Sequence, residues 1–233
     1  MTDYLLELLY PSLCVLCQRG VESYNTLCDE CLRKLPRTEH HLLRENKVEL
    51  LFADIFSRPR KHWDRPRFAR GGAWLKYDDN VATLIHSGKF FERPELAEFL
   101  GRQAALEWQD SGFFDEVDLL VPVPIHPRRL NERGYNQSEF ICRGLASVLN
   151  LPIDTTTIQR IRDTPKQSQL TDAERLKNVE HAFHIPKPET WHKKHILLVD
   201  DVITTGATIR NCIKEITPIR SCRISVFSLA TAR

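Results

Sequence analysis

The chain has 233 residues, of which 42% are hydrophobic and 27% charged, and its formal net charge is +2. This length suffices for one full α/β domain and a small satellite, and the composition is that of an ordinary globular protein. The balanced charge excludes a chain-wide basic field for nucleic acid. Residues 1–11 lack a basic n-region and carry Asp3, Glu7 and Pro11, so we expect neither a signal peptide nor membrane insertion, but a cytoplasmic protein with reduced thiols.

Four of the seven cysteines lie close together near the N-terminus, as Cys14-x-x-Cys17 and Cys28-x-x-Cys31. Two such pairs converging on one ion provide the four thiolates of a structural Zn²⁺ site, which leaves no coordination position for catalysis. A segment this short has little core of its own, so metal binding would supply much of its folding free energy. A disulfide-stapled knob and a redox pair are the alternatives, and the lack of an export signal favours zinc.

A basic stretch follows this head. Between positions 58 and 70 only Asp64 opposes six basic residues, and Trp63 and Phe68 stand among them. Cations interleaved with aromatic rings are typical of sites for single-stranded nucleic acid. A solvated connector is the alternative, and charge runs of this kind are common in linkers. We therefore expect a zinc-finger-like head over residues 1–50, a basic linker over 51–70 and a larger domain over 71–233. The six basic residues are Arg58, Arg60, Lys61, Arg65, Arg67 and Arg70.

Helical and strand patterns alternate through the larger domain. Apolar spacing predicts helices near residues 81–85, 94–100 and 138–149, and a capping box at Thr171 predicts another. Strands are expected at 117–121, 153–158 and 223–229, and in the apolar run that begins at His195. This alternation predicts a mostly parallel sheet flanked by helices.

The most informative stretch follows that apolar run. Asp200 and Asp201 come first, then a loop of small and hydroxyl residues, then a helical pattern. Such a loop at the carboxyl edge of a sheet is suited to phosphate, because glycine lets the backbone approach and the first helical turn offers unpaired N–H groups. Carboxylates suit sugar hydroxyls or a metal. The alternative is a buried strand and an N-capped helix, with the two acids merely exposed. The loop consists of Thr204, Thr205, Gly206, Ala207 and Thr208.

Two further segments carry candidate residues. Arg128 and Arg129 follow the strand expected at 117–121, in a loop stiffened by proline, and guanidinium pairs there suit a diphosphate. A surface turn with arginines paired to glutamates is the alternative. Residues 160–170 are polar and aperiodic, as in a lid over a phosphate-rich ligand, or in an ordinary exposed loop. The lid candidates are Arg162, Lys166 and Gln167.

The segment from His195 to Thr208 closely resembles the 5-phosphoribosyl-1-diphosphate (PRPP) signature of type I phosphoribosyltransferases. With the cysteine quartet, Pro122-Val123-Pro124, Arg133-Gly134-Tyr135-Asn136-Gln137 and Thr164-x-x-Gln167, the order of motifs resembles the ComF (competence protein F) family over nearly the whole chain. Many members of that family carry a second cysteine quartet, which this chain lacks. We therefore expect one metal in a simpler head.

The resemblance implies a type I phosphoribosyltransferase fold with a small zinc-binding head. It implies a pentosyltransferase that binds Mg²⁺ and PRPP and transfers ribosyl phosphate to an unknown acceptor with release of diphosphate. Asp200 and Asp201 would then hold the ribose hydroxyls, and residues 204–208 the 5′-phosphate. The resemblance also implies a link to competence and DNA uptake, with single-stranded DNA and other competence proteins as partners. A non-catalytic adaptor that handles DNA and senses PRPP or nucleotides is the alternative.

Overall fold

The computed structural model describes residues 12–21, 26–43, 45–56, 66–90, 93–163 and 182–232. The helices in these ranges are α2 (Asp29–Lys34), α3 (Lys47–Leu50), α4 (Ala53–Phe56), α5 (Asp79–Phe90), α6 (Pro94–Trp108), α7 (Pro127–Arg133), α8 (Gln137–Leu149) and α10 (Ala207–Ile216), with 3₁₀ turns η1 (His40–Leu42), η2 (Gln109–Ser111) and η4 (Pro188–Trp191). The strands are β1 (Arg67–Lys76), β2 (Leu119–Pro122), β3 (Gln159–Arg160), β4 (Phe183–His184), β5 (His195–Ile203) and β6 (Arg223–Thr231). Within these ranges, no helix has the length and apolar character needed to cross a bilayer.

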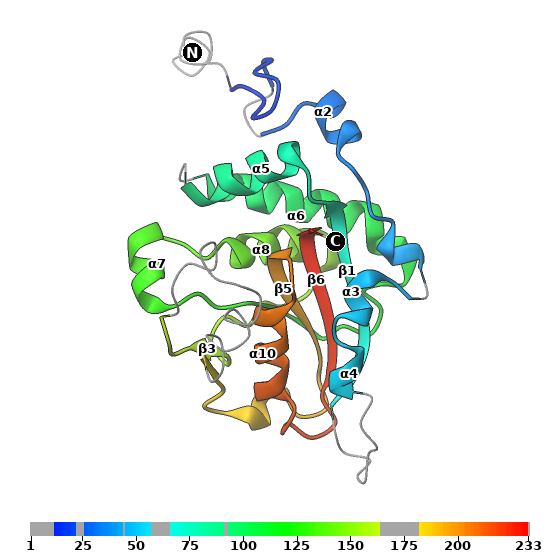
Figure 1. Ribbon diagram of the computed structural model, residues 1–233, viewed down its shortest axis with the longest axis vertical. Coiled ribbons are helices and arrows are strands. Elements are labelled where there is room, and N and C mark those ends of the chain that lie inside the picture. The colour runs from blue at the N-terminus through cyan, green and yellow to red at the C-terminus, as the bar shows by residue number, and fades with distance from the viewer. Residues whose placement is uncertain are drawn as a thin grey trace.

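A parallel sheet with the strand order β1-β6-β5-β2 forms the centre of the protein (Figure 1). Beyond β2, Ile153 forms a single parallel bridge with Leu120. The sheet confirms the mostly parallel architecture predicted from the sequence. The strand predicted over residues 153–158 is wrong beyond that bridge, because the side chain of Asp154 accepts the backbone N–H groups of Thr156 and Thr157 and turns the chain. Regular pairing resumes only in the short antiparallel pair β3–β4.

Both faces of the sheet are covered by apolar side chains. On β5, Leu197 and Val199 lie in the cluster that α6 and α8 help to form, whereas Ile196 and Leu198 lie in a second cluster with the apolar face of α10. On β6, Phe227 and Leu229 lie in the first cluster, and Ile224 and Val226 lie in the second. Full burial on both faces is expected for parallel strands joined by helices. The central strands are thus held in one position between two helical layers, which fixes where their carboxyl ends lie.

The outer edge of β1 is covered by the chain that leads from the head. Residues 36–38 add an antiparallel segment, in which Lys76 donates to the carbonyl oxygen of Pro36 and Thr38 to that of Trp74. The imidazole Nδ1 of His40 accepts the N–H of Ala73 at 3.2 Å. Unpaired edge strands invite pairing with other chains, so this cover closes a vulnerable edge.

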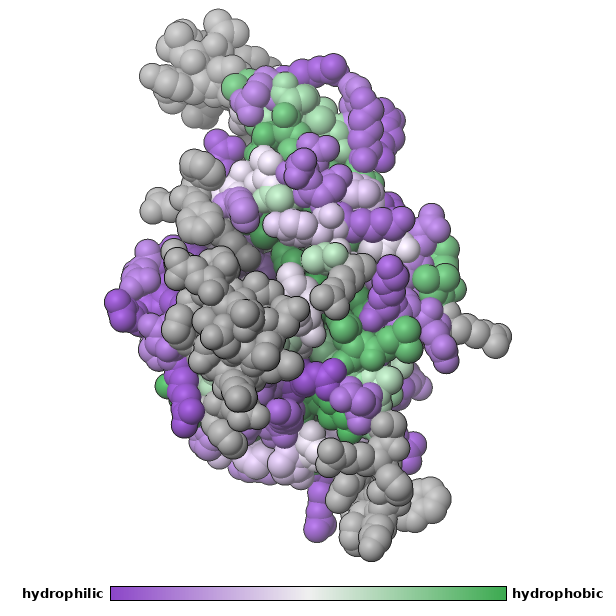
Figure 2. Space-filling view, in the orientation of Figure 1, coloured by the Kyte–Doolittle hydropathy of each residue, from purple (hydrophilic) through white to green (hydrophobic). Residues whose placement is uncertain are grey.

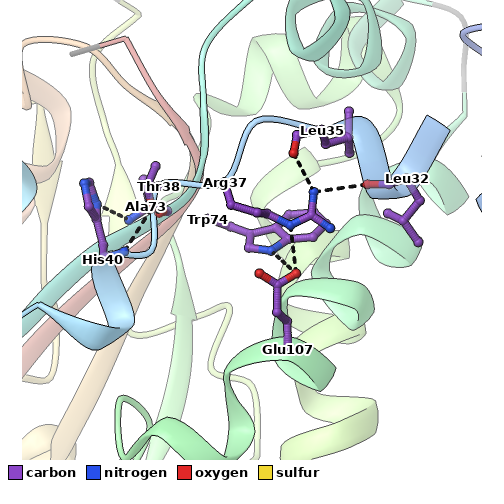
Figure 3. A network of polar contacts seen from close by, with 8 residues as sticks. All are labelled: Leu32, Leu35, Arg37, Thr38, His40, Ala73, Trp74 and Glu107. Carbon is purple, nitrogen blue, oxygen red and sulfur yellow. Dashed lines mark hydrogen bonds and ion pairs between the residues drawn. The ribbon is translucent and has the colours of Figure 1, made fainter. Parts of the chain in front are cut away.

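Arg37 fastens the head to α6 (Figure 3). Its guanidinium donates to the carbonyl oxygens of Leu32 and Leu35 and lies 2.8 Å from Glu107, while it also stacks over the Trp74 ring. The indole N–H of Trp74 donates to the same Glu107 oxygen at 3.0 Å. Glu107 therefore accepts from two partners at once, and the chain leaving α2 is held against the larger domain.

His40 generates a prediction about acid stability. Burial, together with the positive charges of Lys47 and Lys76, lowers its pKa from the ordinary value of 6.5 to about 4. Between these two values the unfolded chain binds a proton that the folded chain does not. The part of the free energy of unfolding that depends on His40 is therefore fully present above pH 6.5 and is lost as the pH falls toward 4. This loss is at most about 3 kcal/mol.

His40→Asn should remove this part of the acid sensitivity, because an amide oxygen can accept the Ala73 N–H but does not titrate. Urea unfolding of the wild type and the variant at pH 7 and pH 5 measures the effect. The wild type should lose more stability between the two pH values than the variant. Equal losses would show that the imidazole is not held neutral.

Candidate functional site

The cysteine quartet forms one compact cluster. The Sγ atoms of Cys14, Cys17, Cys28 and Cys31 all lie within 4.8 Å of one another. A tetrahedral Zn²⁺ with Zn–S bonds of about 2.3 Å requires sulfur atoms about 3.8 Å apart, and the Cys17 and Cys28 sulfurs are separated by 3.7 Å. The four residues therefore fit structural zinc with little movement. This is the only group of at least three metal-ligating side chains found among the described residues.

The thiols of this cluster differ in their protonation. Burial opposes ionisation of Cys14, but hydrogen bonds from the backbone N–H groups of Cys17, Cys28 and Leu16 outweigh it and lower its pKa to about 6. Burial and the neighbouring thiols raise the pKa of Cys31 to about 12. Four adjacent thiolates repel one another unless a cation neutralises them, which is what zinc supplies.

The head is packed into the larger domain rather than tethered to it. Leu27 and Leu35 are almost fully buried, and they belong to the same apolar cluster as Val81, Leu84 and Ile85 of α5. Figure 1 shows α2 above α5, on the side toward which the parallel strands point. The metal site therefore stabilises a helix that borders the carboxyl edge of the sheet.

At this edge, β2 and β5 are neighbours whose following helices leave toward opposite faces. The chain after β2 reaches α8 on one face, and the chain after β5 enters α10 on the other. In open parallel sheets, ligands bind outside the carboxyl ends of the strands where the connections diverge in this way. The predicted acidic pair and phosphate loop both lie at this point.

Asp200 and Asp201 are half-buried at the end of β5. Oδ1 of Asp200 accepts the N–H of Asp201 at 2.9 Å and the hydroxyl of Ser138 at 3.3 Å. Oδ1 of Asp201 accepts the N–H of Val202 at 2.7 Å. These bonds orient both carboxylates, and oxygen donors of this kind suit sugar hydroxyls and hard cations such as Mg²⁺.

The predicted phosphate loop connects β5 to α10. Thr204 is exposed, and Thr205 and Thr208 are half-buried. Gly206 is the N-cap of α10 and has the left-handed backbone angle φ of 72°, and Ala207 opens the helix. The hydroxyl of Thr205 accepts the N–H of Ala207 at 3.4 Å. The loop therefore brings hydroxyl groups and the positive end of a ten-residue helix to the acidic pair.

Three consecutive buried polar residues at the start of α8 support this site, and the sequence interpretation gave them no role. Asn136 donates to the carbonyl oxygen of Val123 in the chain after β2, and Gln137 donates to that of Ile85 in α5. Ser138 donates to Asp200. One short segment thus ties together three elements that border the site. Asn136 and Gln137 end the motif Arg133-Gly134-Tyr135-Asn136-Gln137 and Ser138 follows it, but the partners of these three residues are 13 to 62 residues away in the chain.

The arginines predicted to bind diphosphate lie on α7 and form ion pairs with carboxylates. Nε of Arg129 lies 3.2 Å from Asp163, and Nε of Arg128 lies 3.1 Å from Glu132. The Arg128 side chain is 72% exposed and the Arg129 side chain 30%. Of the lid candidates, Arg162 is exposed, whereas Lys166 and Gln167 lie outside the described residues. Nη1 of Arg128 also lies 3.7 Å from Asp163, so an incoming anion would compete with Asp163 for Arg128 and Arg129.

Arg160 is a further cation in this region that the sequence interpretation did not single out. It is only 9% exposed and its guanidinium lies over the Phe183 ring. Burial and the nearby charge of Arg129 lower its pKa, while the charges of Asp200 and Asp163 act in the opposite direction. A buried positive charge therefore stands near the acidic pair.

Only part of the basic stretch falls within the described residues. Arg67 and Arg70 belong to β1, and residues 58–65 lie outside. Arg67 is exposed, whereas Arg70 donates to the carbonyl oxygen of His41 at 3.1 Å and lies over the Phe113 ring. Arg70 thus has a structural role at the edge of the sheet, which the linker interpretation did not anticipate.

Comparisons with known proteins identify a matching domain and similar proteins. Residues 5–42 match the model of the double zinc ribbon domain. The chain is 31% identical over 200 residues to DNA utilization protein YhgH of Escherichia coli K12, covering 84% of this chain and 80% of the relative. It is 26% identical over 224 residues to competence protein F of Haemophilus influenzae, covering 94% and 90%. Superposition on adenine phosphoribosyltransferase from Leishmania tarentolae gives a TM-score of 0.38 at 9% identity, over 85% of this chain and 94% of that chain.

The parallel sheet, the acidic strand end and the glycine-capped helix define an α/β fold of mostly parallel strands flanked by helices, preceded by an N-terminal zinc ribbon. The chain belongs to the ComF family, the family of the DNA utilization and competence proteins to which it is similar.

The packing of the head predicts how the protein responds to loss of zinc. Zinc binding contributes about 10–16 kcal/mol in isolated zinc fingers, which is comparable with the whole stability of a domain, about 5–15 kcal/mol. Since the head shares its core with α5, we expect a strong chelator to lower the melting temperature of the entire protein. Metal analysis should find one zinc per chain, and added zinc should restore the original transition. Two zinc ions per chain, or an unchanged transition after removal, would contradict this arrangement.

The loop glycine predicts a second effect on stability. A Cβ atom at Gly206 would be strained by the left-handed backbone conformation of this residue. It would also lie 3.1 Å from the Phe52 ring. Gly134 is the matched control, because its φ is 82° but nothing lies within 4 Å of a Cβ there. In urea unfolding, Gly134→Ala should cost about 1–2 kcal/mol for the backbone alone, and Gly206→Ala should cost more. A smaller cost at Gly206 would mean that the ring does not pack on the loop.

Proposed function

We propose that this protein binds PRPP with Mg²⁺ and acts as a phosphoribosyltransferase linked to DNA utilization. The observation that carries the proposal is the meeting of two helix N-termini, from opposite faces of the sheet, beside Asp200. One helix, α10, follows the glycine-capped loop, and the other, α8, begins at Gln137 and holds Ser138, whose hydroxyl is bonded to the Asp200 carboxylate, in its first turn. This combination of a helix dipole with oriented acids suits a ligand that carries both a phosphoryl group and a diol.

In this proposal, different residues bind different parts of the ligand. Residues 204–208 bind the 5′-phosphate through backbone N–H and hydroxyl groups, and Asp200 and Asp201 accept hydrogen bonds from the ribose hydroxyls. Arg128 and Arg129 leave Asp163 to bind diphosphate, and Arg162, Lys166 and Gln167 close over it. Mg²⁺ supplies charge neutralisation for the diphosphate when it is bound. Cations there stabilise charge that develops on the leaving group.

The proposed reaction breaks the bond between the anomeric carbon and the diphosphate oxygen, which keeps the electron pair. A bond then forms between that carbon and the nucleophilic atom of an acceptor. The charge that develops on the carbon lies on the sugar that Asp200 and Asp201 hold, and a nearby carboxylate can stabilise it. We place this activity in a cytoplasmic protein with a head over residues 1–50, a linker over 51–70 and the transferase domain over 71–233.

A non-catalytic adaptor for single-stranded DNA is the second candidate, and the names of the relatives favour a DNA-linked role. The two candidates differ in what they require of Asp200. DNA binding that weakens with salt and survives Asp200→Ala would favour the adaptor. Variants for that assay should keep Arg70, since it bonds the backbone at His41, and should neutralise Arg65 and Arg67 instead.

Calorimetry with Mg²⁺ and PRPP tests the proposal. The wild type should bind, and Asp200→Asn and Asp201→Asn should each weaken binding on the order of tenfold or more, since each removes the charge from a hydrogen-bonded acceptor. Asp115→Asn is the matched control, because Asp115 is exposed ahead of β2 at the opposite edge of the sheet. Release of diphosphate from PRPP in a screen of nucleobases and amines would then identify the acceptor. No heat at millimolar concentrations of Mg²⁺ and PRPP, with well-folded protein, would contradict the proposal.

A further inference from the structure

Residues 46–54, which precede β1 in the chain, contact the phosphate loop and the first turn of α10. Arg210 lies in the first turn of α10, and its Nη1 is 2.8 Å from both carboxylate oxygens of Asp54 in α4. Its Nη2 donates to the carbonyl oxygen of Leu51, in the turn between α3 and α4. The guanidinium thus donates to three acceptors. These fix its orientation more firmly than a single ion pair would.

The same segment also packs against the loop through an aromatic ring. Phe52 is fully buried, and its ring atoms lie 3.1 and 3.2 Å from the position that a Cβ of Gly206 would occupy. Figure 2 shows apolar surface over α3, where Leu50 is 64% exposed. The Phe52 ring therefore faces inward, onto the loop that precedes α10.

This contact is anchored to the sheet and not only to α10. Asn46 caps α3 by accepting the N–H groups of Val48 and Glu49, and its side-chain amide donates to the carbonyl oxygen of Gly71 in β1 at 2.7 Å. In return, Gly71 donates to the carboxylate of Glu49 at 3.1 Å. The segment therefore bridges β1 and the start of α10, the helix that follows β5, and β1 and β5 are separated in the sheet by β6.

We propose that residues 51–54 position the phosphate loop for its ligand, with Asp54 acting through Arg210. The inference rests on the proposed function of this loop. A phosphate site made of backbone N–H groups gains affinity when the N–H groups are already aligned before binding. Phe52 fills the space beside the glycine, and the Asp54–Arg210 pair fixes the first turn of the helix. Both sets of contacts act on the loop from outside the ligand site.

The exposure of Asp54 makes this inference testable without unfolding the protein. Its side chain is 69% exposed, and exposed ion pairs contribute little to global stability, about 0.2–1 kcal/mol. The Glu116–Arg223 pair is the matched control, because the Glu116 side chain is also 69% exposed and pairs with Arg223 at the first residue of β6. Asp54→Ala and Glu116→Ala thus remove comparable carboxylates, one beside the loop and one at the opposite edge of the sheet.

The experiment measures affinity for ribose 5-phosphate and for PRPP with Mg²⁺, together with the melting temperature of each variant. Asp54→Ala should weaken both affinities on the order of fivefold, with a melting temperature within a few degrees of the wild type. Glu116→Ala should leave affinity unchanged, and Asp54→Glu should restore most of the loss.

The outcomes separate the inference from the proposed function. If the wild type binds neither compound, the proposed function fails. If the wild type binds and Asp54→Ala binds equally well, the positioning role is overturned while the proposed function stands. A loss of affinity that only follows a loss of stability, or that Asp54→Glu does not restore, also overturns the positioning role.

Discussion

The burial of β5 on both faces and along both edges is the constraint on which the rest of the structure depends. The strand pairs with β6 and β2, and its side chains alternate between two separate apolar clusters. A shift of the strand by one residue would move each of these side chains into the wrong cluster. Because the strand is fixed, the acidic pair at its end and the loop after it are fixed as well.

The N-terminal segment supports the candidate site at the carboxyl edge of the sheet in three ways. Its zinc cluster stabilises apolar residues that pack on α5, and Arg37 ties the chain after α2 to Glu107 and Trp74 (Figure 3). The following residues cover the outer edge of β1 before they reach Gly206 and Arg210. The head and its connection are thus part of the framework of the candidate site.

The sequence predicted the features that depend on local spacing and missed those that depend on distant partners. The cysteine quartet, the acidic strand end and the α10 pattern are local, and the structure forms a cluster, a strand end and a helix from them. The strand β1 was missed because Arg67, Arg70 and two glycines interrupt its apolar pattern. The roles of Ser138 and Asp54 could not be predicted, since each acts on a residue far along the chain.

A crystal structure with PRPP and Mg²⁺ bound tests the central claim most directly, because it locates each part of the ligand. We expect a phosphoryl group within hydrogen-bond distance of the backbone N–H groups at residues 205–208, and the ribose diol on the carboxylates of Asp200 and Asp201. A fully occupied ligand elsewhere on the protein, with this loop empty, would contradict it.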